Sequence, residues 1–203
     1  MNTEISTQPP YSFAFTAASL RLNDLKALVE AERSGTTTSQ SLGFKTESSG
    51  KRVRQELQKR AHQLSDKQAD LLLHGMSEEQ QHLAFWAACK TYPLLFDFVR
   101  DVVREKFMVN DTHLHYGDFQ AFAHRQAAYH PQLERVSETT FRKGRQIVFR
   151  MLEEAGLIAG KRMHKIIQPQ LYSLRFLEAI APDPPQWRFC LLLDDDRLQS
   201  LTP

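Results

Sequence analysis

The amino-acid sequence predicts a mostly α-helical protein, with an N-terminal helical bundle followed by a winged-helix-like region. Three observations support this fold class. Apolar residues recur with a period of about 3.6 through most of the 203 residues. Two short apolar runs, at 157–158 and 166–167, enclose a polar tip and predict a β-hairpin. The chain has only 8 glycines and 9 prolines, which excludes a collagenous or low-complexity protein.

Residues 1–112 are predicted to form the N-terminal helical domain. One helix is expected from about Ser19 to Glu32 and a second from about Gly50 to Gln63, because apolar residues in both follow helical spacing. The segment between them, 34–49, is rich in serine and threonine. This composition predicts a mobile loop.

The remainder of this half is predicted to contain a helical hairpin. Ser65 and Ser77 are good N-cap residues, and Ser77 stands three residues before Gln80, which is the spacing of a capping box. From Pro93 to Phe107 an apolar stripe runs opposite charged positions, the pattern of an amphipathic helix packed on a core. Tyr92 precedes the proline and marks the corner, because a residue before proline leaves the helical region.

Residues 113–203 are predicted to form the winged-helix-like domain. Its helix candidates lie at 118–128, 132–135 and from about Ser137 to Ala155, and the hairpin follows around a basic segment at 159–165. This is the element order of a winged helix-turn-helix. Beyond Pro169 one more helix is expected, while the periodicity of the tail leaves a strand and a short helix open.

The third helix of this domain separates an apolar face from a basic face. On a helical wheel with about 100° per residue, one side carries Phe141, Gly144, Val148, Met151, Leu152 and Ala155. The other side carries Arg142, Lys143, Gln146 and Arg150, with Arg145 at the border. Between residues 137 and 165, seven basic residues stand against three acidic ones, so this segment is strongly basic.

These residues predict a nucleic-acid contact surface. Ser137, Thr139 and Thr140 and the free N–H groups at the helix N-terminus are expected to hold a phosphate. Base edges or phosphates are the expected targets of Arg142, Gln146 and Lys143. Lys161, Arg162 and Lys165 are expected to form a wing on the backbone phosphates, with Glu153 and Glu154 away from the contact surface. The alternative is an ordinary solvated face, and the pattern alone leaves both open.

A second basic cluster lies at residues 51–60. Lys51, Arg52, Arg54, Lys59 and Arg60 stand there against one acid, Glu56. A helix face of this kind can lie along phosphates and would give a salt-dependent affinity. A solubilising helix surface is the competing interpretation.

Other function classes find little support in the sequence. No glycine-rich phosphate loop or nucleophile motif is present, so we expect no enzymatic activity and no cofactor. Cys89 and Cys190 are predicted to be buried hydrophobes in a reducing compartment. His113 and His115 form an HxH in a predicted loop, but surface or capping roles are favoured over a metal site. The net charge of +2 does not by itself indicate an anionic partner.

The expected location is the cytoplasm, without a membrane contact. The first ten residues are polar and include Pro9-Pro10, unlike a signal peptide. No uncharged apolar run approaches the roughly 20 residues that span a bilayer.

Four segments resemble the BrxA family of BREX (bacteriophage exclusion) systems. They are YSFAFTAASL at 11–20, LAFWAACKTYPLLFDFVRDVVREKF at 83–107, HPQLERVSETTFRKGRQIVFRMLEEAGLI at 130–158 and IIQPQL at 166–171. The resemblance covers most of residues 11–180 and does not extend to the loop at 34–49 or to the tail after about Pro182.

The resemblance implies an all-helical protein, similar in part to the NusB antitermination fold, that binds nucleic acid and has no activity of its own. The resemblance also implies that the protein works together with a methyltransferase, an ATPase and an alkaline-phosphatase-like protein. The resemblance assigns no binding residues, so the predicted binding residues are based on the helical wheel and the charge pattern. The leading hypothesis is a non-catalytic component that binds double-stranded DNA mainly through phosphates. The alternatives are an adaptor that docks other BREX subunits, and an RNA-binding protein like NusB.

Overall fold

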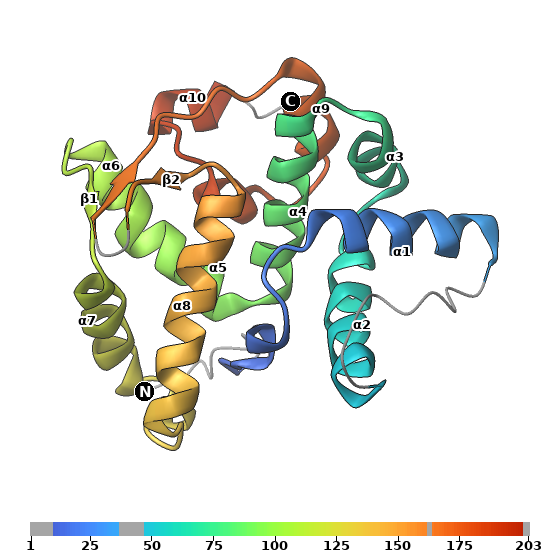
Figure 1. Cartoon of the computed structure of the whole chain (residues 1–203). Helices are drawn as coiled ribbons and strands as arrows, with labels where there is room; N and C mark the ends of the chain where they lie inside the picture. Colours follow the sequence, from blue (N-terminus) through green and yellow to red (C-terminus); the bar gives the residue numbers. More distant parts are fainter. Residues whose placement is uncertain (1–9, 37–46, 162–163, 201–203) are drawn as a thin grey trace, which may run out of the picture.

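The computed structural model describes residues 10–36, 47–161 and 164–200. Helices form most of it, and a small sheet lies at one side (Figure 1). The longer helices are α1 (Leu22–Ser34), α2 (Glu47–Ala61), α3 (Asp66–His74), α4 (Ser77–Thr91), α7 (Tyr116–Ala127) and α8 (Glu138–Glu154). The shorter helices are α5 (Pro93–Phe98), α6 (Glu105–Met108), α9 (Leu174–Ile180) and α10 (Asp195–Ser200), and the 3-10 turns are η1 (Ala14–Ala17), η3 (Pro131–Leu133) and η4 (Pro185–Cys190). The strands are β1 (His113–Leu114), β2 (Ile158–Ala159) and β3 (Lys165–Ile167).

The predicted fold class is confirmed. The second half runs β1, α7, η3, α8, β2, β3, and its antiparallel sheet has the strand order β1-β3-β2. This part is therefore winged-helix-like. The hairpin predicted from the two apolar runs is present, with Ile158 opposite Ile167. Strand β1 was not predicted, because two residues are too few to show a period of two.

The helix boundaries follow the sequence in most places. Ser65 caps α3 in a full capping box with Gln68. The prediction for Ser77 is wrong, because Met76 occupies the N-cap of α4 and the Glu79 carboxylate accepts its N–H at 2.8 Å. The helix predicted from Pro93 is present, but it passes through a π-helical turn, η2 (Val99–Arg104), before α6. The tail, which the sequence left open, forms η4 and α10. Most of the loop predicted at 34–49 lies outside the described residues.

One hydrophobic cluster includes buried residues from both halves of the chain. Trp86 of α4 meets Phe176 of α9 edge to face, with ring centroids 6.4 Å apart. Phe98 of α5 lies 5.0 Å from Phe119 of α7 and 6.3 Å from Phe149 of α8. Because interiors are close-packed, this shared core fixes the position of α8 relative to the N-terminal helices.

The segment before α1 also holds α8 in place. The Phe13 ring lies over Gly144, so close that a Cβ at this position would be 2.3 Å from a ring carbon. On its other side, the segment is bound by the fully buried guanidinium of Arg60, which donates to the carbonyls of Ala18 (2.8 Å) and Ser19. Arg60 is therefore a structural residue and does not belong to the predicted basic surface of residues 51–60.

No helix within the described residues is long and apolar enough to cross a bilayer.

Candidate nucleic-acid interface

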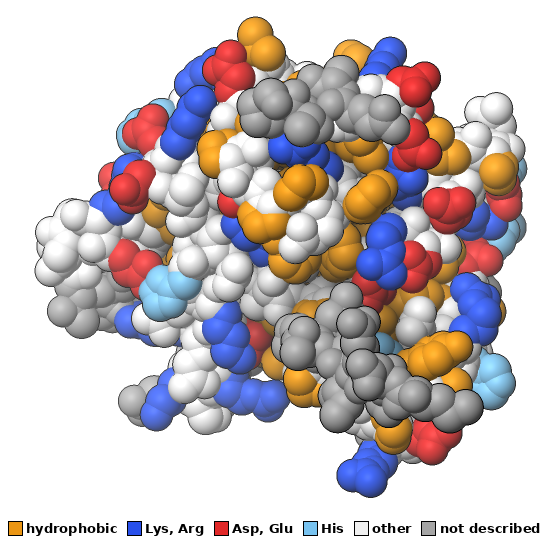
Figure 2. Space-filling model, turned by 180° about the vertical axis from the view of Figure 1, so that it is seen from behind, with side chains coloured by type: hydrophobic (Ala, Val, Ile, Leu, Met, Phe, Trp, Pro, Cys, Tyr) orange, Lys and Arg blue, Asp and Glu red, His pale blue; other side chains and the backbone are white. Residues whose placement is uncertain are grey.

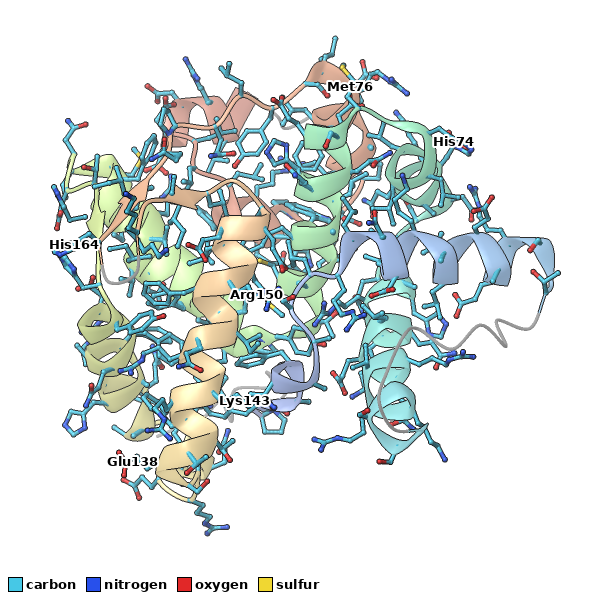
Figure 3. All side chains as sticks on the ribbon, in the orientation of Figure 1. His74, Met76, Glu138, Lys143, Arg150 and His164 are labelled. Carbon is cyan, nitrogen blue, oxygen red and sulfur yellow. The ribbon has the colours of Figure 1, made fainter. Side chains whose placement is uncertain are left out.

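Helix α8 buries one face and exposes the other as the wheel predicts. Gly144, Val148, Met151, Leu152 and, at the C-cap, Ala155 are buried, and Phe141 is half-buried. Arg142, Lys143, Gln146 and Arg150 are exposed. Arg142 and Lys143 have no ion-pair partner among the described residues. Figure 3 shows Lys143 and Arg150 along one side of the helix.

Arg145, at the border of the wheel, lies against the protein. Its guanidinium carbon sits 4.6 Å from the centre of the Tyr116 ring, a cation–π distance. Its Nε is buried and meets no hydrogen-bond acceptor among the described residues. This side chain therefore packs α8 on α7 more than it extends the basic surface.

The two acids at the end of α8 lie closer to the basic residues than expected. Glu154 accepts from Arg150 Nε at 3.0 Å, and also from the Ser19 hydroxyl and the Leu20 N–H. The expectation that these carboxylates stay away from the contact surface is therefore wrong for Glu154, which pairs with Arg150. Arg150 nonetheless keeps two thirds of its side-chain surface exposed, where an ion pair contributes little.

Lys165 does not belong to a wing surface, contrary to the prediction. Its side chain is buried, and its Nζ contacts the Glu153 carboxylate and the Gly160 carbonyl, the latter at 2.9 Å. The reason is strand alternation, because Leu114 opposite Lys165 is also buried and the pair faces inward. Lys161 is exposed, and Arg162 lies outside the described residues.

The N-terminus of α8 is capped by its own side chains. The Ser137 hydroxyl accepts the Thr140 N–H at 3.3 Å and donates to the Thr140 hydroxyl at 2.9 Å. Thr139 is exposed and Thr140 is half-buried. The Ser137 side chain therefore caps the helix. Thr139 and the remaining N–H groups stay the predicted phosphate contacts at this end of α8.

A groove of about 840 Å³ runs along the exposed side of α8. One wall is Lys143, Ile147, Arg150 and Glu154, and the other is the segment from Thr16 to Asp24. Helices α8 and α2 point in the same direction on either side of this segment (Figure 1). Lys143 and Arg150 therefore border a concave surface.

The second basic cluster is smaller than predicted. Lys51 and Arg52 are exposed and Arg54 is half-buried. Lys59 pairs with Glu56 at 2.6 Å but keeps 55% of its side-chain surface exposed. Only Arg60, which is buried, is removed from the predicted surface. From behind, Figure 2 shows several Lys and Arg side chains on the lower projection that α2 forms.

Near the wing, the structure adds a third histidine to the HxH pair that the sequence shows. His113, His115 and His164 are all exposed, and the register that pairs His113 with Ile166 places His115 opposite His164. Ring centroids are 6.3 Å apart for His113 and His115 and 6.5 Å apart for His115 and His164. Without β1 the sequence could not show that they share a face. The structure, over its described ranges, arranges no three His, Cys, Asp or Glu side chains to hold a metal ion.

Fold and surface together define a mostly helical protein with a winged-helix-like half and a basic, solvent-facing helix. The sequence model described as BrxA matches residues 9–181, so the chain belongs to the BrxA family, as the sequence resemblance predicted. A relative described as BREX protein BrxA, from Bacillus cereus (strain H3081.97), is 27% identical over 135 residues, 66% of this chain and 68% of that protein. The crystal structure of an uncharacterized protein from Magnetospirillum magneticum has a similar fold, with a TM-score of 0.77 at 19% identity over 91% of this chain and 98% of that one.

Proposed function

We propose that this protein is a non-catalytic, double-stranded DNA-binding component of a bacterial BREX phage-defence system. The family membership and the name of the Bacillus cereus relative support the BREX context. The DNA-binding part is supported by one observation above the others: α8 exposes Arg142, Lys143, Gln146 and Arg150 on a helix whose opposite face is buried. A row of cations and an amide on one helix face suits phosphates and base edges.

The affinity is expected to come mainly from phosphates. The exposed cations on α8 and α2 belong to flexible side chains on the surface, which neutralise phosphates without reading sequence. Binding should therefore be weakly sequence-selective and strongly salt-dependent.

A mobility-shift assay on duplex DNA at low salt tests this function. The double variant Arg142→Ala/Lys143→Ala should weaken binding at least about tenfold, because two unpaired cations are lost. Lys67→Ala/Arg175→Ala is the matched control, because it also removes two exposed cations, but from α3 and α9, and should leave binding unchanged. No shift of wild-type protein at low salt, or equal affinity of the α8 variant and wild type, would refute the proposal. Competition with structured RNA separates DNA from RNA preference.

A second candidate function, an adaptor for other BREX subunits, is favoured by an apolar surface elsewhere. Met76, Leu171 and Leu174 are 63%, 86% and 71% exposed. The chain at Met76 lies near Ser173, which precedes Leu174, because Glu79 accepts both the Met76 N–H and the Ser173 hydroxyl. Exposed apolar groups of this kind mark protein contacts. Met76→Ser/Leu171→Ser/Leu174→Ser should lose co-purification with a methyltransferase, ATPase or phosphatase-like subunit while DNA binding persists.

A further inference from the structure

The groove beside α8 is built from both halves of the chain. One wall is a stripe of α8, and the other is the segment from Thr16 to Asp24, more than a hundred positions earlier in the sequence. Figure 3 shows Lys143 and Arg150 on the side of α8 that faces this segment. A ligand in the groove therefore meets a surface that neither half of the chain forms alone.

The spacing of the α8 wall suits a strand of nucleic acid. Lys143, Ile147 and Arg150 follow one another at four and three residues, so they form one stripe along the helix. With a rise of about 1.5 Å per residue, the two cations are about 10 Å apart along the helix axis. One strand of duplex DNA carries a phosphate about every 3.4 Å along its axis, so the stripe matches about three phosphate intervals. The half-buried Ile147 between the cations suits the uncharged sugars.

Glu154 fixes the guanidinium of Arg150. The Glu154 carboxylate accepts from the Ser19 hydroxyl at 2.9 Å and from the Leu20 N–H at 2.7 Å, both on the opposite wall. The same carboxylate accepts from Arg150 Nε at 3.0 Å. The terminal nitrogens of Arg150 meet no acceptor within the described residues. Because a guanidinium is planar, fixing Nε orients these nitrogens as a fork, which can bind two oxygens of one phosphate.

The charges of the groove favour an anionic ligand. Asp24 on the opposite wall pairs with Arg21, and Glu154 pairs with Arg150. Lys143 has no ion-pair partner in the part of the chain that the structure describes, so the groove has one cation in excess. Arg150 keeps 66% of its side-chain surface exposed. A phosphate can therefore contact both α8 cations without breaking an existing ion pair.

We propose that this groove seats the sugar-phosphate backbone of one strand of the bound DNA, with Arg150 as a phosphate fork and Glu154 as the residue that positions it. The inference rests on the proposed DNA-binding function and adds the segment before α1 and the first turn of α1 to the contact surface. Lys143 contacts a neighbouring phosphate of the same strand. Arg142 and Gln146, on the next stripe of α8, are then available for base edges.

The first test separates positioning from charge. Removing a carboxylate close to a phosphate should tighten DNA binding, whereas removing the anchor of Arg150 should weaken it. We expect Glu154→Gln to raise the duplex-DNA dissociation constant at least about threefold at low salt, because the fork is no longer held. Glu138→Gln is the matched control, since it removes an exposed carboxylate from the first turn of the same helix and should not weaken binding. Equal or tighter binding by Glu154→Gln overturns the positioning role.

Two variants that keep Glu154 test the groove itself. Arg150→Lys keeps the charge but loses the fork, and should weaken binding at least about threefold. Asn23→Glu puts a carboxylate on the opposite wall and should weaken binding at least about fivefold. Position 23 is exposed in the first turn of α1, where an acid stabilises a helix, so this loss does not come from unfolding. Gln186→Glu adds the same charge on η4, outside the groove, and should leave the affinity unchanged.

The outcomes distinguish the groove from the function on which it rests. Unchanged affinity of Asn23→Glu or of Arg150→Lys overturns the groove, even where Arg142→Ala/Lys143→Ala weakens binding. Absence of any duplex shift by the wild-type protein at low salt instead refutes the DNA-binding function itself.

Discussion

At the residue scale, Gly144 shows how closely the N-terminal segment approaches α8. Position 144 is helical, and the sequence assigned it only to the apolar face. Its actual constraint is the Phe13 ring, which itself lies 6.0 Å from the ring of Phe141. Such a neighbour is invisible in a sequence, since it comes from residues more than a hundred positions away.

We predict that Gly144→Ala destabilises the protein despite the higher helix propensity of alanine. The new methyl group would displace the Phe13 ring, and overpacking of this kind costs about 1–3 kcal/mol. Thermal or urea unfolding measures the loss. Gly117→Ala on α7 is the control, since a Cβ there meets nothing within 4 Å, and should not lower stability. Equal stability of both variants would show that the Phe13 ring does not pack against α8 at Gly144.

Lys165 provides a second residue-scale prediction, because its inward position separates stability from binding. Lys165→Met should reduce the free energy of unfolding by about 1–3 kcal/mol, since Glu153 and the Gly160 carbonyl lose their partner. DNA affinity should change less than about twofold. Lys161→Met should do the reverse, with unchanged stability and weaker binding. A Lys165 variant that is fully stable but binds poorly would contradict the inward placement.

At the element scale, one carboxylate joins the starts of two helices. Glu79 of α4 accepts from the Ser173 hydroxyl at 2.6 Å, which caps α9, and from the Met76 N–H at 2.8 Å. Chiefly through the Ser173 hydrogen bond, these contacts hold the pKa of Glu79 below its ordinary value of 4.5. A carboxyl with a lowered pKa in the folded state stabilises the protein above its unfolded pKa and loses that contribution as the pH falls.

Glu79→Gln should therefore lower stability at pH 7 by about 1–3 kcal/mol, because the amide replaces a charged acceptor. The difference between wild type and variant should shrink as the pH falls below 4.5. Urea titrations at pH 7 and pH 3.5 measure both values. A difference that stays constant with pH would show that the charge of Glu79 does not join the helices.

The same scale shows what sequence reasoning reaches and where it stops. Long amphipathic helices such as α8 and the helix starting at Pro93 were predictable, because more than three turns of periodic burial leave a clear pattern. Strand β1 was not predictable. Without it, the sequence could not show that His164 points outward and Lys165 points inward. The start of α4 was misplaced because Glu79 supplies the cap from inside the helix, without a capping side chain at Met76.

At the scale of the whole molecule, one hydrophobic core includes buried residues of both α2 and α8, the two helices that carry the basic surfaces. Of the predicted α8 cations, Arg142, Lys143 and Arg150 are exposed, whereas Arg145 packs on Tyr116. On α2, Lys51, Arg52 and Lys59 are exposed, with Lys59 paired to Glu56, and Arg54 is half-buried. A wheel finds which residues face outward, but it cannot find that Arg145 packs against the ring of Tyr116 on another helix.

The most direct test of the account is the salt dependence of duplex-DNA binding at pH 8.0. If about six phosphates are contacted, the slope of log K against log salt should be near −5, and Arg142→Ala/Lys143→Ala should make it shallower by about two. The alanine variant must retain the wild-type unfolding midpoint. A slope near zero, or one that the double substitution leaves unchanged, would contradict the assignment of α8 as the DNA-binding surface.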